Sequence, residues 1–372
     1  MRIALVRAKY DPFGGAERFV ETAVHALADA GVSLTIFTRA WPANANPAIA
    51  HRIVNPRYLT SLGRDKSFAR AVCRALADDP HDLVQAHERI ACCDIYRAGD
   101  GVHAEWLHQR ARASGLVKRA TTALNPHHRY LLRAERELFT SSRLKAVICN
   151  SRMVRDEIAR HFGTDRAKLH VIYSGVDSDK FSPEVNAPLR SPMRSELGIA
   201  DKQPAALFVG SGFERKGLGI FLQAVARERD LFAVVVGKDK QKARYQALAR
   251  ELGLSGRVPF AGGVQDVRPY YAAADLFVLP TLYDPFPNAC LEAFASGLPV
   301  VTSRSSGAAE LVQAGVNGFV TDARDIDAIA KAMRDCVGQP AMEKAARDTV
   351  AALTPAAMAA QYLALYRTLL AR

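Results

Sequence analysis

Short apolar runs alternate with stretches of helical periodicity along most of the chain. In the first half, the runs that predict strands lie at residues 2–7, 33–38, 82–86, 145–149 and 169–173. In the second half they lie at residues 205–209, 232–236, 258–260, 276–280, 300–302 and 318–321. Strands that alternate with helices are typical of parallel sheets. The pattern therefore predicts an α/β fold of doubly wound, Rossmann-like domains.

The two series of strands are separated by residues 182–192, which contain three prolines and few apolar side chains. Such a composition is typical of a linker. A chain of 372 residues is also long enough for two domains that each bury a core. We therefore expect one domain at residues 1–182 and another at residues 183–355, facing one cleft.

Residues 275–303 predict a strand, a loop, a short helix at 289–296 and a second strand. In a parallel sheet this places the loop at the carboxyl ends of the strands, where open α/β sheets bind ligands. Asn288 is a good N-cap residue, so the free amides and the helix dipole from there onward predict an anion site. Asp284 and Glu292 lie eight positions apart. We expect Asp284 at the mouth of the cleft and Glu292 a turn inside it, both accepting hydrogen bonds from sugar or ribose hydroxyls.

A second candidate anion site follows the first strand of the second series. The sequence Gly-Ser-Gly-Phe-Glu-Arg-Lys-Gly at residues 210–217 combines three glycines with Arg215 and Lys216. Backbone freedom and two adjacent cations suit a diphosphate. The Walker pattern GxxxxGK[ST] is absent. Either stretch alone is also compatible with an ordinary turn, but together they predict one diphosphate site at one sheet edge.

Two further positions could approach a ligand from the first domain. Gly14 and Gly15 follow the first strand and would let backbone come close to a ligand, although a tight turn explains them equally well. The dinucleotide pattern GxGxxG is absent, which disfavours hydride transfer. His103 lies in a glycine-containing stretch and is either a cleft residue or a structural histidine.

The net charge of +12 and the pI near 9.5 call for an acidic partner, such as nucleic acid, an anionic membrane or a phosphorylated substrate. Nucleic acid is disfavoured because no binding motif accompanies the charge. Residues 103–136 interleave basic and aromatic side chains, which predicts contact with an anionic membrane. The candidate membrane residues are Arg110, Arg112, Lys118 and Arg119. A pair of amphipathic helices with a solvated basic face is the alternative.

Six cysteines show no metal-binding spacing and are expected to be buried thiols. No apolar run is long enough to span a bilayer, and no signal-peptide core is evident. These features favour a cytoplasmic protein. The Asp-Ser-Asp triplet at 177–179 could be a metal motif but falls at the predicted linker, so we expect no metal site.

With these motifs placed, nearly the whole chain resembles the retaining GT-B glycosyltransferases of family 4. The resemblance rests on four stretches: Lys9 to Arg18, Gly210 to Gly217, VVGKDK at 235–240 and the run at 272–301. Within the family it is similar to the core glucosyltransferases of bacterial lipopolysaccharide synthesis. The resemblance implies two Rossmann-like domains and a C-terminal helix at residues 356–372 that packs on the first domain.

The resemblance also implies roles for particular residues. Arg215 and Lys216 would neutralise the diphosphate, Glu292 would hold the ribose hydroxyls, and His103 would lie near the reacting sugar. The remaining donor-binding positions are Gly14, Gly15, Gly212, Val264, Phe286, Pro287, Asn288 and Ala289. Where the family has Glu, seven residues and Glu, this chain has Asp284 as the first member. The shorter side chain reduces its reach to the donor sugar and weakens its case as a nucleophile.

The implied activity is transfer of glucose, or another hexose, from a UDP-sugar to a heptose of the lipid A–core acceptor. It would be metal-independent, need no cofactor, and take place at the cytoplasmic face of the inner membrane. Two alternatives remain open: a family-4 transferase with another nucleotide sugar and acceptor, and a non-catalytic nucleotide-sugar-binding protein.

Overall fold

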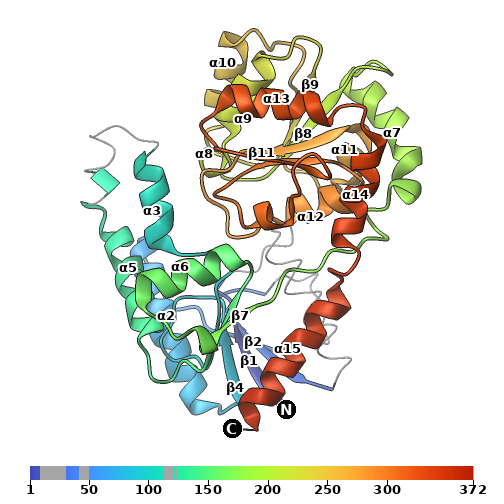
Figure 1. Ribbon diagram of the computed structural model, residues 1–372. Helices are drawn as coiled ribbons and strands as arrows, with labels where there is room; N and C mark the ends of the chain where they lie inside the picture. The colour runs from blue at the N-terminus through green and yellow to red at the C-terminus, as the bar shows by residue number, and fades with distance from the viewer. Residues whose placement is uncertain (9–30, 42–49, 113–120, 123, 372) are drawn as a thin grey trace. The chain divides into compact units, whose positions relative to one another are not determined.

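The computed structural model describes residues 1–8, 31–41, 50–112, 121–122 and 124–371. The chain forms two compact units, each of which is considered by itself (Figure 1). The first unit comprises Met1–Ser174 and Pro355–Arg372, and the second comprises Gly175–Thr354. The chain therefore leaves the first unit after Ser174, earlier than the boundary expected after Ser182.

The first unit is built on a seven-stranded sheet in the order β3-β2-β1-β4-β5-β6-β7. Neighbouring strands pair in parallel throughout. The strands are β1 (Arg2–Val6), β2 (Ser33–Thr38), β3 (Ala50–Ile53), β4 (Leu83–Ala86), β5 (Ile95–Arg97), β6 (Ala146–Cys149) and β7 (Leu169–Val171). The strand order reverses between β1 and β4, as expected for a doubly wound sheet.

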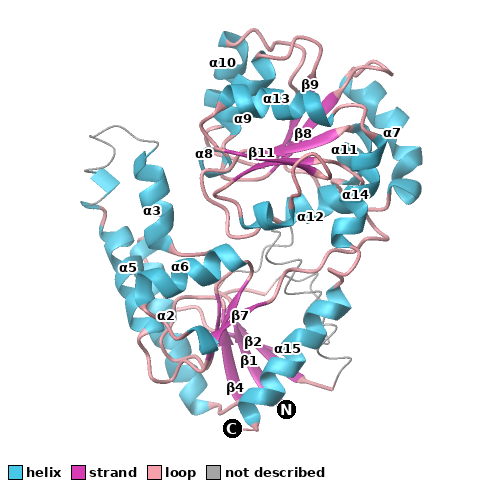
Figure 2. Cartoon of the chain, in the orientation of Figure 1, coloured by secondary structure: helices cyan, strands magenta, loops and turns pink. Residues whose placement is uncertain are grey.

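Helices cover both faces of this sheet (Figure 2). They are α2 (Ser61–Asp78), α3 (His103–Arg112), α5 (Pro126–Phe139), α6 (Arg152–Phe162), the 3₁₀ turn η1 (Arg166–Lys168) and α15 (Pro355–Leu370). One apolar core joins the sheet to α2 and α6. The other joins it to α15, whose Tyr362 and Tyr366 are fully buried. Their hydroxyls are bonded to Arg97 and Gln85, so α15 is held by polar contacts as well as by packing.

The second unit contains a six-stranded sheet in the order β10-β9-β8-β11-β12-β13, again parallel throughout. Its strands are β8 (Ala205–Val209), β9 (Phe232–Val236), β10 (Phe260–Gly262), β11 (Leu276–Leu279), β12 (Val300–Ser303) and β13 (Gly318–Thr321). Its helices are α7 (Pro183–Leu197), α8 (Phe213–Lys216), α9 (Leu218–Ala226), α10 (Lys242–Glu251), α11 (Arg268–Ala273), α12 (Asn288–Ala295), η2 (Gly307–Leu311), α13 (Ile326–Cys336) and α14 (Pro340–Val350).

The expected linker at residues 182–192 is wrong, because this segment belongs to helix α7 of the second unit. The Ser182 side chain caps the helix, and Pro183 stands in the first turn, where proline is tolerated. Two further prolines lie inside the helix. Arg190 and Arg194 of α7 donate to main-chain carbonyls at the end of α11, at 2.8–2.9 Å. Arg190 also donates to the Asp275 carboxylate at 2.6 Å. These contacts secure a helix whose proline content predicts a loop.

The cysteine prediction is wrong for two of the six residues. Cys73 of α2 and Cys92 are joined by a disulfide, with their Cα atoms 5.9 Å apart. The pairing depends on a contact between a helix and a distant loop, which spacing along the chain does not reveal. The other four are free and buried: Cys93, Cys149, Cys290 and Cys336. In the described part of the chain, every helix is too short or too polar to span a bilayer.

Candidate active site

The candidate site lies where the strand order of the second sheet reverses, between β8 and β11. Both strands are continuous buried apolar runs, as expected for the centre of a parallel sheet. The segment after β8 carries α8, and the segment after β11 leads into α12. Ligands of open α/β sheets bind at this position, outside the carboxyl ends of the strands. The structure thus brings the two predicted anion-binding stretches to one edge.

Main-chain contacts hold these two segments together. The Arg215 carbonyl accepts hydrogen bonds from the Leu282 amide and the Thr281 hydroxyl, each at 2.8 Å. Gly217 adopts φ +77°, and a Cβ there would lie 2.0 Å from the Pro280 carbonyl oxygen. Only glycine satisfies both requirements. The position of the two cations is therefore set by backbone rather than by flexible side chains.

Lys216 and Asp284 form a buried ion pair at the centre of the site. The Lys216 side chain is 12% exposed, and Asp284 is 4% exposed as a residue. Arg215, with a side chain 37% exposed, has its Nη1 at 3.9 Å from the same carboxylate. Burial acts to raise the pKa of Asp284, but Lys216 and Arg215 outweigh it and hold that pKa below its usual range. Asp284 therefore stays charged and offsets part of the positive charge of Lys216 and Arg215.

The expectation that Asp284 would stand at the mouth of a cleft is wrong. Its main chain is fixed on both sides: the Asp284 amide donates to Ser305 at 3.0 Å, and its carbonyl accepts from Gly307 at 2.8 Å. Its side chain is pulled inward by the pair with Lys216. The segment after β12 therefore supports the loop after β11, a contact that has no local signal in the sequence.

Helix α12 begins at Asn288, one residue earlier than the expected start at residue 289. Pro287 is the N-cap and Asn288 the first helical residue, so the prediction that Asn288 caps the helix is wrong. The Pro287 side chain makes no capping hydrogen bond. The helix ends before Gly297, whose φ of +75° suits glycine. The N-terminus of a helix is the positive end of its dipole, which favours a bound anion.

Glu292 lies within α12 and is 6% exposed. The Tyr271 hydroxyl is 3.0 Å from its Oε2 and 3.1 Å from the Ala289 carbonyl oxygen. Tyr271 comes from α11 and is almost fully buried. It is a residue that the sequence reasoning missed, although its place just after the Gly-Gly-Val-Gln stretch could have marked it. Its hydroxyl orients the carboxylate that the resemblance assigns to the ribose.

The other predicted donor-binding positions surround the same sheet edge. Gly212 has φ +76° and begins α8. Val264 is half-buried in the loop after β10, beside Gly263. A Cβ on Gly263 would lie 2.2 Å from Lys238 Cε, so the Lys238 side chain packs directly against this loop. Phe286 and Pro287 are both buried. Lys238 was not among the predicted residues.

His103 begins helix α3 of the first unit and is 9% exposed. Its amide donates to Glu135 Oε1 at 2.7 Å, and its Nε2 lies 3.0 Å from His128 Nδ1. Burial, with help from Arg89, lowers the pKa of His103 to about 3. The imidazole is therefore neutral at physiological pH and acts as a hydrogen-bonding group. Glu135 lies on an amphipathic helix and gave no sequence signal.

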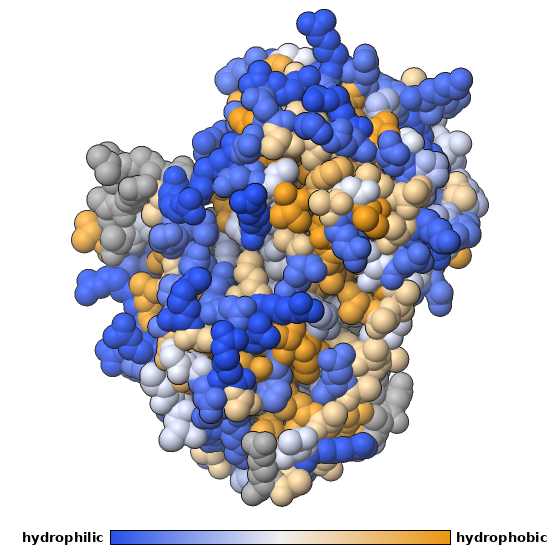
Figure 3. Space-filling model, in the orientation of Figure 1, coloured by the Kyte–Doolittle hydropathy of each residue, from blue (hydrophilic) through white to orange (hydrophobic). Residues whose placement is uncertain are grey.

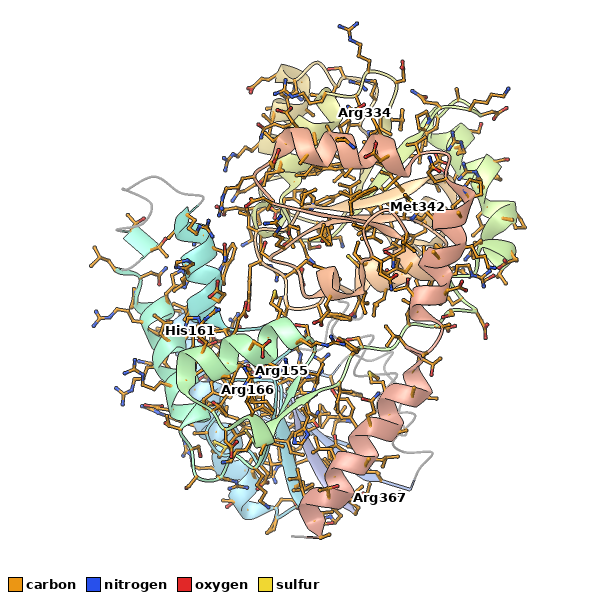
Figure 4. The ribbon with its side chains drawn as sticks, viewed as in Figure 1. Arg155, His161, Arg166, Arg334, Met342 and Arg367 are labelled. Carbon is orange, nitrogen blue, oxygen red and sulfur yellow. A yellow bond between two sulfur atoms is a disulfide. The ribbon has the colours of Figure 1, made fainter. Side chains whose placement is uncertain are left out.

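Contacts with α6 fix the same helix α3. Glu105 of α3 accepts from Arg160 at 2.9 Å and lies 3.1 Å from Nε2 of His161, which is labelled on α6 in Figure 4. Although burial acts to raise it, these partners lower the pKa of Glu105. The carboxylate thus remains charged and ties the two helices together.

Some predicted residues lie outside the described part of the chain: Gly14, Gly15, Lys118 and Arg119. Of the remaining predicted membrane residues, Arg112 is exposed and Arg110 is half-buried. Burial lowers the pKa of His128, and the positive charge of Arg110 lowers it further. The Arg110 charge is therefore felt by a side chain of its own unit.

Within the described residues, no group of three or more His, Cys, Asp or Glu side chains could hold a metal.

Comparison with known proteins gives a consistent result. Residues 13–180 match the family model described as Glycosyltransferase Family 4, and residues 190–350 match the one described as Glycosyl transferases group 1. The lipopolysaccharide glucosyltransferase WaaG of Escherichia coli (strain K12) is 28% identical over 318 residues, covering 84% of this chain and 83% of that protein. The lipopolysaccharide core biosynthesis glycosyltransferase LpsE of Rhizobium meliloti (strain 1021) is 36% identical over 144 residues, covering 39% of this chain and 42% of that protein.

The fold is shared with a solved structure over nearly its full length. The crystal structure of WaaG, described as a glycosyltransferase involved in lipopolysaccharide biosynthesis, superposes with a TM-score of 0.85 at 25% identity. The match covers 98% of this chain and 99% of that one. The predicted GT-B fold is therefore confirmed.

Proposed function

Since this chain is a glycosyltransferase of family 4 with the GT-B fold, we propose that it transfers glucose from a UDP-sugar to a heptose of the lipopolysaccharide inner core. Two relatives support this acceptor class, because WaaG is named as a lipopolysaccharide glucosyltransferase and LpsE as a lipopolysaccharide core glycosyltransferase. In line with the family resemblance, the transfer retains the anomeric configuration of the donor sugar.

One observation carries the proposal: two adjacent cations and the start of helix α12 converge at the strand reversal of the second sheet. Arg215 and Lys216 meet the loop that leads into α12, and their counter-ion is Asp284. A donor diphosphate is a stronger anion than one carboxylate and can make several charge-assisted hydrogen bonds. On binding, the diphosphate takes over Lys216 and Arg215, whose positive charge Asp284 offsets only in part between turnovers.

The same groups act on the chemical step. Breaking the bond between the sugar and the diphosphate leaves the electron pair on a phosphate oxygen, where negative charge develops. Cations and amides that already point to that oxygen stabilise this charge without reorganising. Arg215 and Lys216 supply the positive charge that a divalent metal provides in other transferases. We therefore propose that catalysis needs no metal.

The neutral His103 and the buried Glu292 have separate roles in this proposal. Glu292, oriented by Tyr271, accepts hydrogen bonds from the ribose hydroxyls. His103 is held by Glu135 and His128, and its uncharged ring suits hydrogen bonding to a sugar hydroxyl. The protein would act at the cytoplasmic face of the inner membrane, in peripheral contact with anionic lipid, as its charge of +12 favours.

The short carboxylate of Asp284 supports a second candidate function. Its carboxylate is shorter than the glutamate of the family pattern and is engaged by Lys216, so its reach to the donor sugar is reduced. This favours a family-4 transferase with a different hexose donor as the alternative.

The experiment is a transfer assay with purified core acceptors that end in heptose. UDP-glucose, UDP-galactose, UDP-N-acetylglucosamine and GDP-mannose are compared, with and without EDTA, and the anomeric configuration of the product is determined by NMR. Transfer from UDP-glucose with retention, unaffected by EDTA, supports the proposal. Transfer from another donor supports the alternative, and inversion or loss of activity with EDTA contradicts the proposed mechanism.

A further inference from the structure

A groove of about 1030 Å³ runs between α2 and α5 of the first unit, and it holds none of the residues assigned to the donor. The two helices lie next to each other (Figure 1). Hydrophilic side chains gather over this flank of the unit (Figure 3). The groove is a discrete concave feature, and its lining combines basic and apolar side chains.

The basic residues form two rows, one on each wall. Lys66, Arg70 and Arg74 are four positions apart on α2, so they share one face of that helix. Arg129 and Arg133 have the same spacing on α5. Residues with this spacing lie about 5–6 Å apart on a helix. Each wall therefore presents its cations on one face of a helix, about one turn apart.

Among the described residues, four of these five cations have no ion-pair partner, and one of the four, Lys66, lies over the Tyr130 ring. Arg133 is paired with Glu137 at 2.7 Å, and Glu137 is the one acid among the described lining residues. Arg70, Arg74 and Arg129 form no side-chain hydrogen bond or ion pair with any residue that the structure describes. Cations left open on facing walls of one groove favour an anionic ligand with more than one charged group.

The lining of the groove also has apolar side chains. They include Ile90 and Ala134, and Cys73 of α2 is cross-linked to Cys92. Arg89, also in the lining, donates from its Nε to Glu135 at 3.0 Å. These covalent and polar contacts favour a groove that is formed before a ligand binds. Apolar surface beside cations suits the ring faces of a phosphorylated saccharide.

We propose that the groove between α2 and α5 is a binding site for phosphorylated saccharides, which it engages through at least two phosphate groups. Arginine binds phosphate with paired donors, and each phosphate monoester carries about −1.5 to −2 charge at pH 7. That the site holds a phosphorylated acceptor rests on the proposed function. The affinity of the groove for phosphates is independent of the proposed function.

The test compares two matched triple variants of the full chain. One is Arg70→Ala, Arg74→Ala, Arg129→Ala. The control is Lys202→Ala, Arg229→Ala, Arg250→Ala, which removes the same charge from exposed positions that precede strands of the second sheet. Glucose 1,6-bisphosphate is titrated at low salt with saturating UDP present, so that the donor site is filled. We expect the groove variant to bind at least about tenfold more weakly than the control, a loss of about 1.4 kcal/mol.

A second arm separates a soluble phosphosugar from a lipid headgroup. Binding to vesicles of phosphatidylglycerol and phosphatidylcholine is measured for the same variants. If the groove variant loses vesicle binding but keeps its affinity for the bisphosphate, the groove is a membrane face and the proposal is wrong. The proposal is also wrong if both triple variants lose affinity for the bisphosphate equally. It is wrong as well if the unmodified protein does not bind the bisphosphate. UDP-glucose binding, followed in parallel, reports on the proposed function independently.

Discussion

Positive charge is neutralised at the carboxyl edge of the second sheet, where Lys216 is paired with buried Asp284, but it is left open along the groove between α2 and α5. The first arrangement is compact and fixed by backbone contacts, so it suits one small anion that exchanges with a carboxylate. The second arrangement is long and carries cations on two walls, so it suits an extended anion. Removing one partner of a buried ion pair is strongly destabilising, whereas removing an exposed charge changes stability little.

The largest effect is expected from removing the paired cations. The double variant Arg215→Ala, Lys216→Ala should lower the rate of sugar transfer by at least about 10²–10³-fold, because donors aimed at the leaving oxygen are lost. Arg215→Ala alone, at a partly exposed position, should keep the melting temperature and still lose most of the activity. Transfer at the original rate in both variants would remove the diphosphate assignment.

The next largest effect is expected on the free energy of unfolding when the Lys216–Asp284 pair is broken. Lys216→Met leaves Asp284 buried without its partner, so the free energy of unfolding should fall by about 3–5 kcal/mol. With Asp284→Asn added, the double variant should be more stable than the sum of the single changes predicts, by about 1–3 kcal/mol. Urea denaturation of the four proteins measures this coupling. Strictly additive effects would show that the two side chains do not interact.

The pH dependence of stability tests the environment of His103. Its pKa is lowered to about 3 by burial and by Arg89, while the unfolded chain protonates near pH 6.5. Below pH 6.5 the unfolded chain binds a proton at His103, whereas the folded protein does not. The free energy of unfolding therefore falls as the pH falls, by up to about 1.4 kcal/mol per pH unit for this group. His103→Gln should reduce that slope between pH 6.5 and pH 5.

The control for this measurement is His108→Gln, at an exposed position of the same helix. It should leave the slope unchanged. His87, fully buried, retains its own contribution in both variants, because burial lowers its pKa well below the usual value. An unchanged slope in His103→Gln would contradict the account of His103 as a neutral, buried group.

The smallest effect is expected in the groove. Arg70→Ala, Arg74→Ala, Arg129→Ala removes exposed cations that have no acidic partner among the described residues. The free energy of unfolding should therefore change by no more than about 0.5 kcal/mol for each substitution. A loss comparable to that of Lys216→Met would show that these arginines serve the fold, and the contrast between the two regions would fail.

Much of the fold could be predicted because central strands of parallel sheets are short apolar runs with clear ends. Strands β2, β8, β9 and β13 begin and end at the predicted residues. Strand β3 was missed, because Ala50–Ile53 is a mostly exposed edge strand with polar side chains. Helix α7 was missed because its three prolines predict a loop. Hydrogen bonds from its arginines to main-chain carbonyls far away in the chain stabilise the helix.

For the candidate site, the positions of the motifs could be predicted from the sequence, but the side-chain pairs could not. Motif spacing placed Arg215 and Lys216 at one sheet edge with the start of α12, because two strands that neighbour at a reversal bring their loops together. The ion pair with Asp284 and the contact between Tyr271 and Glu292 join residues far apart in the chain. Side-chain pairing of this kind depends on packing in three dimensions. The disulfide of Cys73 was hidden for the same reason.

The most direct test of the central claim is a calorimetric comparison of UDP with uridine. Two charge-assisted contacts to the diphosphate contribute about 3 kcal/mol or more, so UDP should bind at least about 100-fold more tightly than uridine. In Arg215→Ala, Lys216→Ala this difference should largely disappear, while uridine binds as before. If the double variant still prefers UDP to uridine by the original factor, the diphosphate is held elsewhere and the account of this site is wrong.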